Sequence, residues 1–301
     1  MIRTAAALAA SLALLTGAAI ADPPAPAPPP NPTAALLAAA PASDWAKIDP
    51  SDLLVMDLAR GGRVVIALAG GFAPAHVANI RSLAKAHWYD GLVIERVQDN
   101  YVTQWGDADG KKPLPKGVPL QLPAEYDRTA SGLAFTPLPY RDTYADAVGA
   151  SGPFPAAETG DAAWLTHCYS MVGVGRDLNP DTGTSGELYA IIGQPARGLD
   201  RNIAVVGRVL KGIELLSALP RGTADLGFYA NPAQRVRIAR VRLASDLPAA
   251  DQPRFEYLKP DSATYAAWVK LRANRQDTFF LRPAGALDVC SALPPVHAPK
   301  G

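Results

Sequence analysis

Side chains that carry most enzyme chemistry are scarce in this sequence. Its 301 residues include two cysteines and four histidines, and the fingerprints of serine hydrolases, P-loop proteins and dinucleotide-binding proteins are absent. Positive and negative charges nearly cancel, with 29 lysines and arginines against 28 aspartates and glutamates. This balance gives no reason to expect a nucleic-acid surface or an acidic partner.

The few metal-ligating side chains are badly spaced for a metal. His76 and His87 fall on one predicted helix, about 16 Å apart along its axis, which is too far to share an ion. His167 and Cys168 are neighbours in a predicted strand and should point to opposite faces. The run DLNPDTGTSGE (177–187) has its glycine one place late for a calcium loop, which favours an ordinary turn. We therefore expect neither a metal nor a cofactor.

Long apolar runs are missing after the first residues, which read MIRTAAALAASLALLTGAAIAD. One basic residue, an apolar run and Ala-Ile-Ala predict a signal peptide over residues 1–21. The alternative is a membrane anchor, but the run from Ala5 to Leu15 is much shorter than the ~20 residues that a spanning helix needs. We expect a soluble, exported, periplasmic protein with no membrane span.

Export to an oxidising compartment bears on the two cysteines. A bridge between Cys168 and Cys290 would close a very long loop and stabilise the fold by ~4–5 kcal/mol. The alternative is two separate buried thiols that behave as small hydrophobic residues. The predicted export favours the bridge.

Proline is abundant, at 29 residues, which favours long loops and linkers over a helical bundle. Residues 22–50 are predicted to be a Pro/Ala-rich linker, because eight prolines fall among alanines between Asp22 and Pro41 and indicate a stiff extended tether. Residues 108–162 are rich in Pro, Gly, Ala and Asp without a sustained period. They predict a long surface insertion.

The rest of the chain has the periodicity of short strands and a few helices. The expected elements are a hairpin at 52–71 turning at Gly61-Gly62, a helix at 72–91, a strand pair at 90–107, strands at 163–175, 186–193, 201–210 and 234–244, a short helix at 211–220, and a tail helix with Tyr265, Trp268, Val269 and Arg272 on one face. Many strands and few short helices favour a mainly β barrel or sandwich with helices at its ends.

Two polar residues interrupt the strand pair DGLVIERVQDNYVTQWGD (90–107). Strict alternation puts Arg96 on the same side as Leu92 and Ile94, beside apolar surface. Taken alone, an arginine whose stem packs while its head reaches solvent is the simpler interpretation. Gln104 alone is equally ambiguous.

Four segments, taken in order, resemble the cyclophilin-type peptidyl-prolyl isomerases. They are APAHVANIRSLAKAHWYDG (73–91), IERVQDNYVTQWGD (94–107), SMVGVGRDLNPDTGTSGELYAIIG (170–193) and LDRNIAVVGRVLKGIELLSAL (199–219). They resemble the family's helix V-x-N-F-x-x-L, its Y-x-G-x-x-F-H-R-V and Q-G-G-D strands, its S-M-A segment and its L-D-x-x-x-x-V-F-G strand. The resemblance runs from about Leu53 to Leu243, interrupted by the insertion.

The resemblance implies an eight-stranded antiparallel barrel capped by two helices, in a domain at 51–245. Residues 246–301 are then a C-terminal helical extension that packs on the barrel. The family's active arginine falls on Arg96 and its glutamine on Gln104, beside an apolar groove on the outer face. The positions that match the family's groove residues, and so are implied to bind substrate, are Tyr101, Val102, Val172, Tyr189 and Leu199.

Four positions depart from the family's pattern. Glu95 stands where a histidine usually precedes the arginine, and Gly198 stands where many members have a pocket tryptophan. Ile203 replaces another pocket histidine, and Trp105 interrupts the usual Gly-Gly. The central pair is kept while the rim is changed, so we expect weaker activity or a shifted substrate preference.

The implied reaction suits these residues physically. Resonance holds an X–Pro bond planar behind a barrier of ~18–20 kcal/mol. A guanidinium that donates to the lone pair of the twisted prolyl nitrogen stabilises the twisted state more than either planar state, which is what catalysis requires. We therefore predict a monomeric isomerase that acts on proline-containing segments of exported proteins.

Two other functions remain open from the sequence. One is a module of the same fold that binds proline-containing segments without useful turnover, which the changed rim favours. The other is a scaffold whose proline tether and tail dock a partner.

Overall fold

Strand residues are apolar on both faces because most barrel strands are covered on both sides. The computed structural model describes residues 31–277 and 279–299, so the predicted signal peptide and the start of the linker lie outside the described residues.

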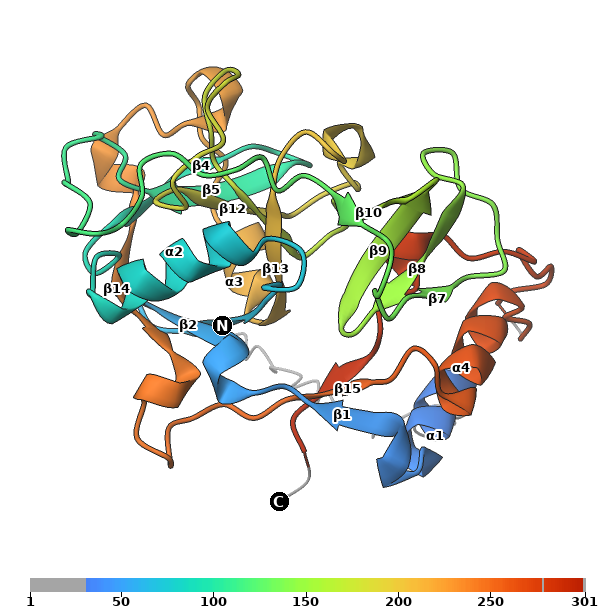
Figure 1. Ribbon diagram of the computed structural model, residues 1–301. Coiled ribbons are helices and arrows are strands. Elements are labelled where there is room, and N and C mark those ends of the chain that lie inside the picture. Colours follow the sequence, from blue (N-terminus) through green and yellow to red (C-terminus); the bar gives the residue numbers. More distant parts are fainter. Residues whose placement is uncertain (1–30, 278, 300–301) are drawn as a thin grey trace, which may run out of the picture. The chain divides into compact units, whose positions relative to one another are not determined.

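Eight antiparallel strands close into a barrel in the order β11-β12-β5-β4-β14-β2-β3-β13 (Figure 1). Their bounds are Leu53–Leu58 (β2), Arg63–Leu68 (β3), Val93–Val97 (β4), Val102–Gly106 (β5), Met171–Val174 (β11), Leu188–Ile191 (β12), Val205–Lys211 (β13) and Val236–Leu243 (β14). The predicted eight-stranded barrel is confirmed.

Two helices pack on the barrel core, as predicted. α2 (Pro74–Lys85) begins with a proline, whose missing N–H costs nothing in a first helical turn. Its residues Val77, Ile80 and Leu83 are buried in the same core as the inward side chains of β2 and β3. The short α3 (Ile213–Ser217) adds Leu216 to that core.

The segment 108–162, which the sequence predicts to be a long surface insertion without a sustained period, contains regular strands. It contains β6 (Arg128–Thr129), β7 (Thr136–Pro137), β8 (Ala147–Ser151), β9 (Phe154–Thr159) and the start of β10 (Ala162–Leu165), which form a five-stranded sheet in the order β6-β10-β9-β8-β7. The expected single strand at 163–175 is therefore two strands in different sheets.

Small residues hide these strands from sequence analysis. Ala150, Ala156 and Ala157 are fully or almost fully buried but give little β signal. At Gly149 an added Cβ would lie 2.0 Å from the Thr136 carbonyl oxygen, so the close strand pairing itself requires glycine.

The extended tether predicted for residues 22–41 is wrong where the structure describes it. Residues Pro32–Ala39 form α1, and Trp45–Lys47 form β1, which pairs with β15 (Glu256–Leu258); β16 (Val296–His297) completes this sheet. Alanine and leucine are strong helix formers, and a proline at the first position does not oppose them.

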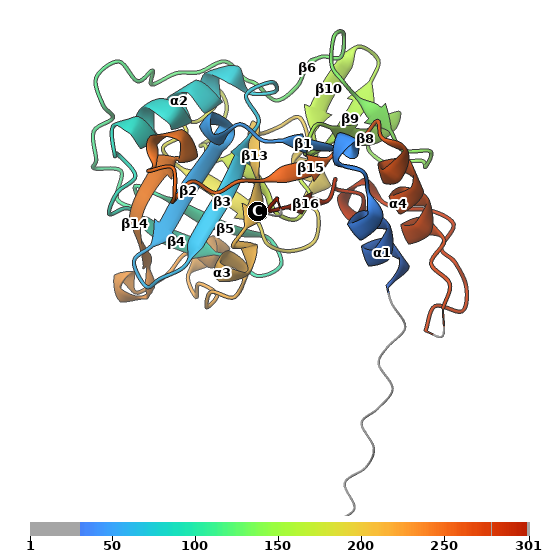
Figure 2. The same cartoon turned by 90° about the horizontal axis from the view of Figure 1, so that it is seen from below.

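The tail helix is present as α4 (Ala263–Ala273), capped by the Ser262 side chain. Tyr265, Trp268 and Val269 are buried in a second core that also contains outward-facing barrel residues such as Leu53 and Val55. This core includes side chains of β8, β9 and α1 as well. Figure 2 shows α1 beside α4, in line with their contacts.

A buried arginine joins three parts of the chain. Arg208 of β13 donates from Nη1 to the carbonyl oxygens of Pro153 in the insertion, at 2.7 Å, and of Pro294 in the tail, at 2.9 Å. Burial lowers the pKa of Arg208 to about 10, so its guanidinium is still charged at neutral pH. Barrel, insertion and tail thus meet at one cation.

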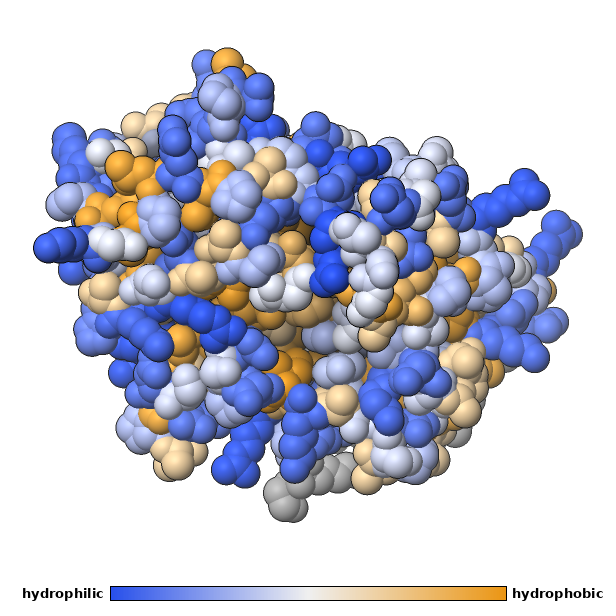
Figure 3. Space-filling view, in the orientation of Figure 1, coloured by the Kyte–Doolittle hydropathy of each residue, from blue (hydrophilic) through white to orange (hydrophobic). Residues whose placement is uncertain are grey.

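A disulfide adds a covalent connection. Cys168 is bonded to Cys290 with an S–S distance of 1.95 Å, and the bridged residues are 122 positions apart. Within residues 31–277 and 279–299, no helix is long and apolar enough to cross a membrane. The face drawn in Figure 3 is mostly hydrophilic with scattered apolar patches, as folded surfaces generally are.

Removing the disulfide tests how much the tail depends on it. We expect Cys168→Ser combined with Cys290→Ser to lower the free energy of unfolding by about 4–5 kcal/mol, because the bond closes a very long loop. Denaturant unfolding of both proteins, with and without reductant, measures this. Equal stabilities would mean that Arg208 and the second core hold the tail unaided.

Candidate active site

A bulge in β4 decides which side chains meet on the barrel's outer face. Ile94 pairs with Trp105 of β5 and Arg96 pairs with Gln104, so Glu95 is one residue too many for the ladder. A bulge shifts the phase of the side chains that follow it. Ile94 therefore packs in the barrel core while Glu95 and Arg96 both line one outer pocket. The prediction that Arg96 shares a side with Leu92 and Ile94 is wrong for this reason.

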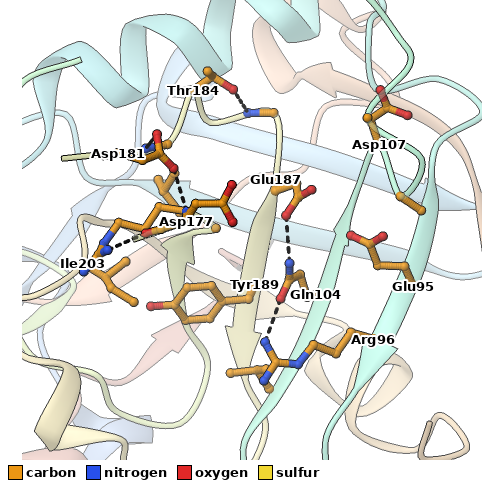
Figure 4. Close-up of a pocket in the computed structure, with 18 of the residues that line it drawn as sticks. Glu95, Arg96, Gln104, Asp107, Asp177, Asp181, Thr184, Glu187, Tyr189 and Ile203 are labelled. Atoms are coloured by element: carbon orange, nitrogen blue, oxygen red, sulfur yellow. Dashed lines mark hydrogen bonds between the residues drawn. The ribbon is translucent and has the colours of Figure 1, made fainter. Parts of the chain in front are cut away.

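The pocket has a volume of about 700 Å³ and is lined from several strands and loops (Figure 4). Six of the seven residues that the resemblance implied for the site line it, namely Arg96, Gln104, Tyr101, Val102, Tyr189 and Leu199. Its apolar end is made by side chains of Tyr101, Val102, Leu199 and Ile203 around Tyr189.

Val172 is the exception. It is 1% exposed and belongs to the core inside the barrel, so it does not line the pocket. Alternation along β11 turns the next residue, Gly173, outward, where an added Cβ would lie 2.3 Å from the Tyr189 hydroxyl. The missing side chain of Gly173 thus leaves the space that the Tyr189 ring occupies. The sequence analysis did not identify this role.

Arg96 and Gln104 are joined directly. The Arg96 Nη1 donates to Gln104 Oε1 at 3.1 Å, and Gln104 Nε2 donates to Glu187 Oε2 at 2.9 Å. This chain fixes which end of the amide is its oxygen, since a carboxylate accepts and a guanidinium donates. Figure 4 shows the three side chains in line along one wall of the pocket.

The remaining contacts of Arg96 hold it from its other side. Its Nε donates to the Leu226 carbonyl oxygen at 2.6 Å, and its Nη2 donates to Gln98 Oε1. The guanidinium carbon lies 5.4 Å from the ring centroid of Phe228 and 5.7 Å from that of Tyr101. Of the five N–H groups of a guanidinium, two remain for a substrate. Arg96 is half-buried, and burial lowers its pKa from the usual high value.

The segment that carries Leu226 and Phe228 had no visible role in the sequence. Phe228 forms an isolated β-bridge with Arg96, and Gly227 between the two pocket residues has φ of 80°. No pattern links these residues to β4, because the contact is made across the fold.

Tyr189 is held by a buried polar network. Its hydroxyl lies 3.0 Å from His167 Nε2, and His167 Nδ1 lies 3.0 Å from Asp200 Oδ1. Asp200 also accepts from Arg197 Nε at 2.5 Å. In the neutral imidazole the carboxylate binds Nδ1–H, which makes Nε2 the acceptor and the tyrosine hydroxyl the donor. Burial raises the pKa of Tyr189, so the phenol stays neutral.

Glu95 is the least satisfied group in the pocket. It is 4% exposed, and its Oε1 has no hydrogen-bond partner. Burial, and then the nearby Glu187 carboxylate, raises the pKa of Glu95 to about 7. Burial also raises the pKa of Glu187, against the hydrogen bond from Gln104.

The other changed positions differ in where they lie. Ile203 lines the pocket, Trp105 is buried in the barrel core, and an added Cβ at Gly198 would meet nothing within 4 Å. Of the insertion, Ala108, Gly110, Lys112 and Leu114 line the pocket, while its strands belong to the second sheet. Within the described residues, no group of three or more His, Cys, Asp or Glu side chains is arranged to hold a metal ion.

A closed antiparallel barrel that carries an arginine, a glutamine and an apolar groove on its outer face defines a cyclophilin-like protein. The chain belongs to the cyclophilin-type peptidyl-prolyl cis–trans isomerase family, because the model of that family, "Cyclophilin type peptidyl-prolyl cis-trans isomerase/CLD", matches residues 53–243. The reaction class implied by the sequence is thereby confirmed.

Individual relatives agree with this family. The chain is 24% identical over 190 residues to a probable peptidyl-prolyl cis-trans isomerase of Brucella suis, which covers 63% of this chain and 82% of that protein. A Brucella melitensis protein of the same description matches equally well. The solved structure of cyclophilin AquaCyp293 from Hirschia baltica is similar in fold, with 22% identity and a TM-score of 0.65, over 79% of this chain and 91% of that one.

The buried carboxyl of Glu95 makes stability depend on pH. Its pKa is raised from 4.5 to about 7 in the folded protein, so its contribution to stability is present below pH 4.5 and is lost as the pH rises to about 7. We expect Glu95→Gln to unfold like the parent protein near pH 4 but to be more stable by about 2 kcal/mol near pH 8.

Denaturant unfolding of both proteins across this range measures the difference. Asp261→Asn, at an exposed carboxylate outside the pocket, is the control and should show no such trend. A difference that stays constant with pH would show that the pKa of Glu95 is the same in the folded and the unfolded protein.

Proposed function

We propose that Arg96 catalyses the cis–trans isomerisation of X–Pro bonds by donating a hydrogen bond to the prolyl nitrogen as the bond twists. The observation that carries this proposal is that Arg96 keeps two unused N–H groups beside an apolar pocket while three others fix its position. A donor held in place before the reaction does not have to reorganise when the transition state forms.

The apolar end of the pocket supports this assignment. Tyr101, Val102, Leu199 and Ile203 offer a surface for a pyrrolidine ring next to Arg96. Excluding water from that surface strengthens the hydrogen bond to the twisted amide.

Gln104 is then the positioning partner of Arg96. Its Oε1 is occupied by the arginine, and one of its two amide hydrogens is occupied by Glu187. The second amide hydrogen is available to a carbonyl of the substrate. The amide can therefore hold the peptide in register with Arg96.

Substitution of Arg96 tests this mechanism. We expect Arg96→Ala to lower kcat/KM for a proline tetrapeptide by about 100-fold or more, as removal of a transition-state donor does elsewhere. Arg282→Ala, at an exposed arginine of the tail, is the matched control and should retain the parent rate. A protease-free isomerisation assay, with far-UV circular dichroism to establish folding, gives the result. Equal rates for Arg96→Ala and Arg282→Ala would instead favour a proline-binding module without useful turnover.

We further propose that the clients are exported proteins and that this chain works in the periplasm. The first 21 residues have the pattern of a signal peptide, and the disulfide suits an oxidising compartment. We expect the full-length chain to be recovered in the periplasmic fraction, shortened after Ala21. N-terminal sequencing of the fractionated protein measures this, and an intact N-terminus in the cytoplasm would contradict the proposal.

A further inference from the structure

The end of the pocket beyond Gln104 holds a carboxylate without a partner. Glu95 is almost fully buried, lines the pocket, and has one oxygen that makes no hydrogen bond. Figure 4 shows its carboxylate directed toward the side where Glu187 and Gln104 lie. Leaving a buried carboxylate unpaired is costly, so such a group normally has a positive partner.

A second carboxylate lies on the same end of the pocket. Glu187 accepts one hydrogen bond from Gln104, and it is close enough to Glu95 to raise that residue's pKa. Asp107 and Asp109 act on Glu95 in the same direction. The field at this end of the pocket is therefore negative, although Arg96 stands at its border.

The nearby cations among the described residues make no ion pair with Glu95. Lys112 donates from Nζ to the carbonyl oxygens of Trp88 and Asp90. Arg235 pairs with Asp109 through Nη1 at 3.3 Å, and its Nε is buried without a hydrogen-bond partner. Arg176 donates to the carbonyl oxygens of Asn202 and Asp177. In the part of the chain that the structure describes, no ion pair includes Glu95 or Glu187.

We propose that the Glu95–Glu187 end of the pocket is a subsite for one cationic side chain, a lysine or an arginine, of the segment whose proline occupies the apolar end. This inference rests on the proposed function and adds the class of client to it. The side chain of a peptide fits better than a metal ion, because no group of three ligating side chains is arranged for a metal among the described residues.

The position of the cation along the peptide follows from strand geometry. Residues i and i+2 of an extended peptide point to the same side and lie about 6.6 Å apart. A proline ring at the apolar end and a side chain at the Glu95 end enter the same pocket, so they belong to residues two apart. A residue next to proline points away from the pocket and should not matter.

The cation also changes the state of the site. Glu95 titrates near neutral pH without a ligand because of burial and the carboxylates of Glu187, Asp107 and Asp109, with Arg235 opposing them. A bound ammonium or guanidinium favours the ionised form of Glu95. Preference for a basic peptide should therefore increase as the pH rises through 7.

The experiment compares proline peptides that differ in one side chain. Lysine or the uncharged norleucine is placed two residues before proline, two residues after it, or next to it, and kcat/KM is measured for each. We expect about a tenfold preference for lysine at one of the positions two residues away and none at the adjacent position. Glu95→Gln and Glu187→Gln should each reduce the preference to about twofold or less, whereas Asp261→Asn should keep it.

The possible outcomes distinguish failure of the subsite from failure of the proposed isomerase activity. Turnover of all peptides without a lysine preference, or a preference that survives Glu95→Gln, overturns the subsite but leaves the isomerase intact. If no peptide is turned over, the proposed function fails, and calorimetric binding of the same peptides still decides the subsite. Tighter binding of the lysine peptide, lost in Glu95→Gln, supports it; equal binding rejects it.

Discussion

Arg96 can face the groove because β4 contains one residue more than β5 over the stretch that they share. Without the extra residue at Glu95, strict alternation would set Arg96 on the side of Ile94, in the barrel core, where a guanidinium has no partner. With it, two neighbouring side chains of opposite charge enter the same pocket. The local irregularity therefore places both the guanidinium of Arg96 and the carboxyl of Glu95 in the pocket.

The positions of the remaining polar groups follow from that placement. Gln104 lies opposite Arg96 in the β4–β5 ladder. Its side-chain amide accepts a hydrogen bond from Arg96 and donates one to Glu187. On the neighbouring strand β12 the His167–Asp200 pair holds the Tyr189 hydroxyl, and Gly173 leaves room for the Tyr189 ring. Arg96, Gln104 and Tyr189 are thus each held by hydrogen bonds to other side chains of the protein, which is how a site stays preorganised.

The sequence was sufficient for the barrel, for its helices and for grouping six of the seven implied site residues around one pocket, because strong apolar runs and ordered motifs carry that information. It failed where the signal is weak or spread over the fold. Alternation of side chains cannot reveal the bulge in β4, so the sequence analysis put Arg96 on the same side of the strand as Ile94. Val172 occupies a groove position by motif but faces inward by register. The strands around Ala150 and Ala156 are built of residues too small to show a period, and Leu226 and Phe228 reach the site only through a contact distant in sequence.

The second core has a consequence for where this protein can be cut. Outward residues of β2 such as Leu53 and Val55 share this core with side chains of the insertion, α4 and α1. Arg208 is capped by the carbonyl oxygens of Pro153 in the insertion and Pro294 in the tail. A fragment trimmed to the stretch that matches the family, 53–243, would keep the insertion and Pro153 but lose α1, α4 and Pro294. Part of this apolar surface and one side of the Arg208 guanidinium would then face water. The hydrophobic cores of this protein therefore extend beyond the residues that match the family model.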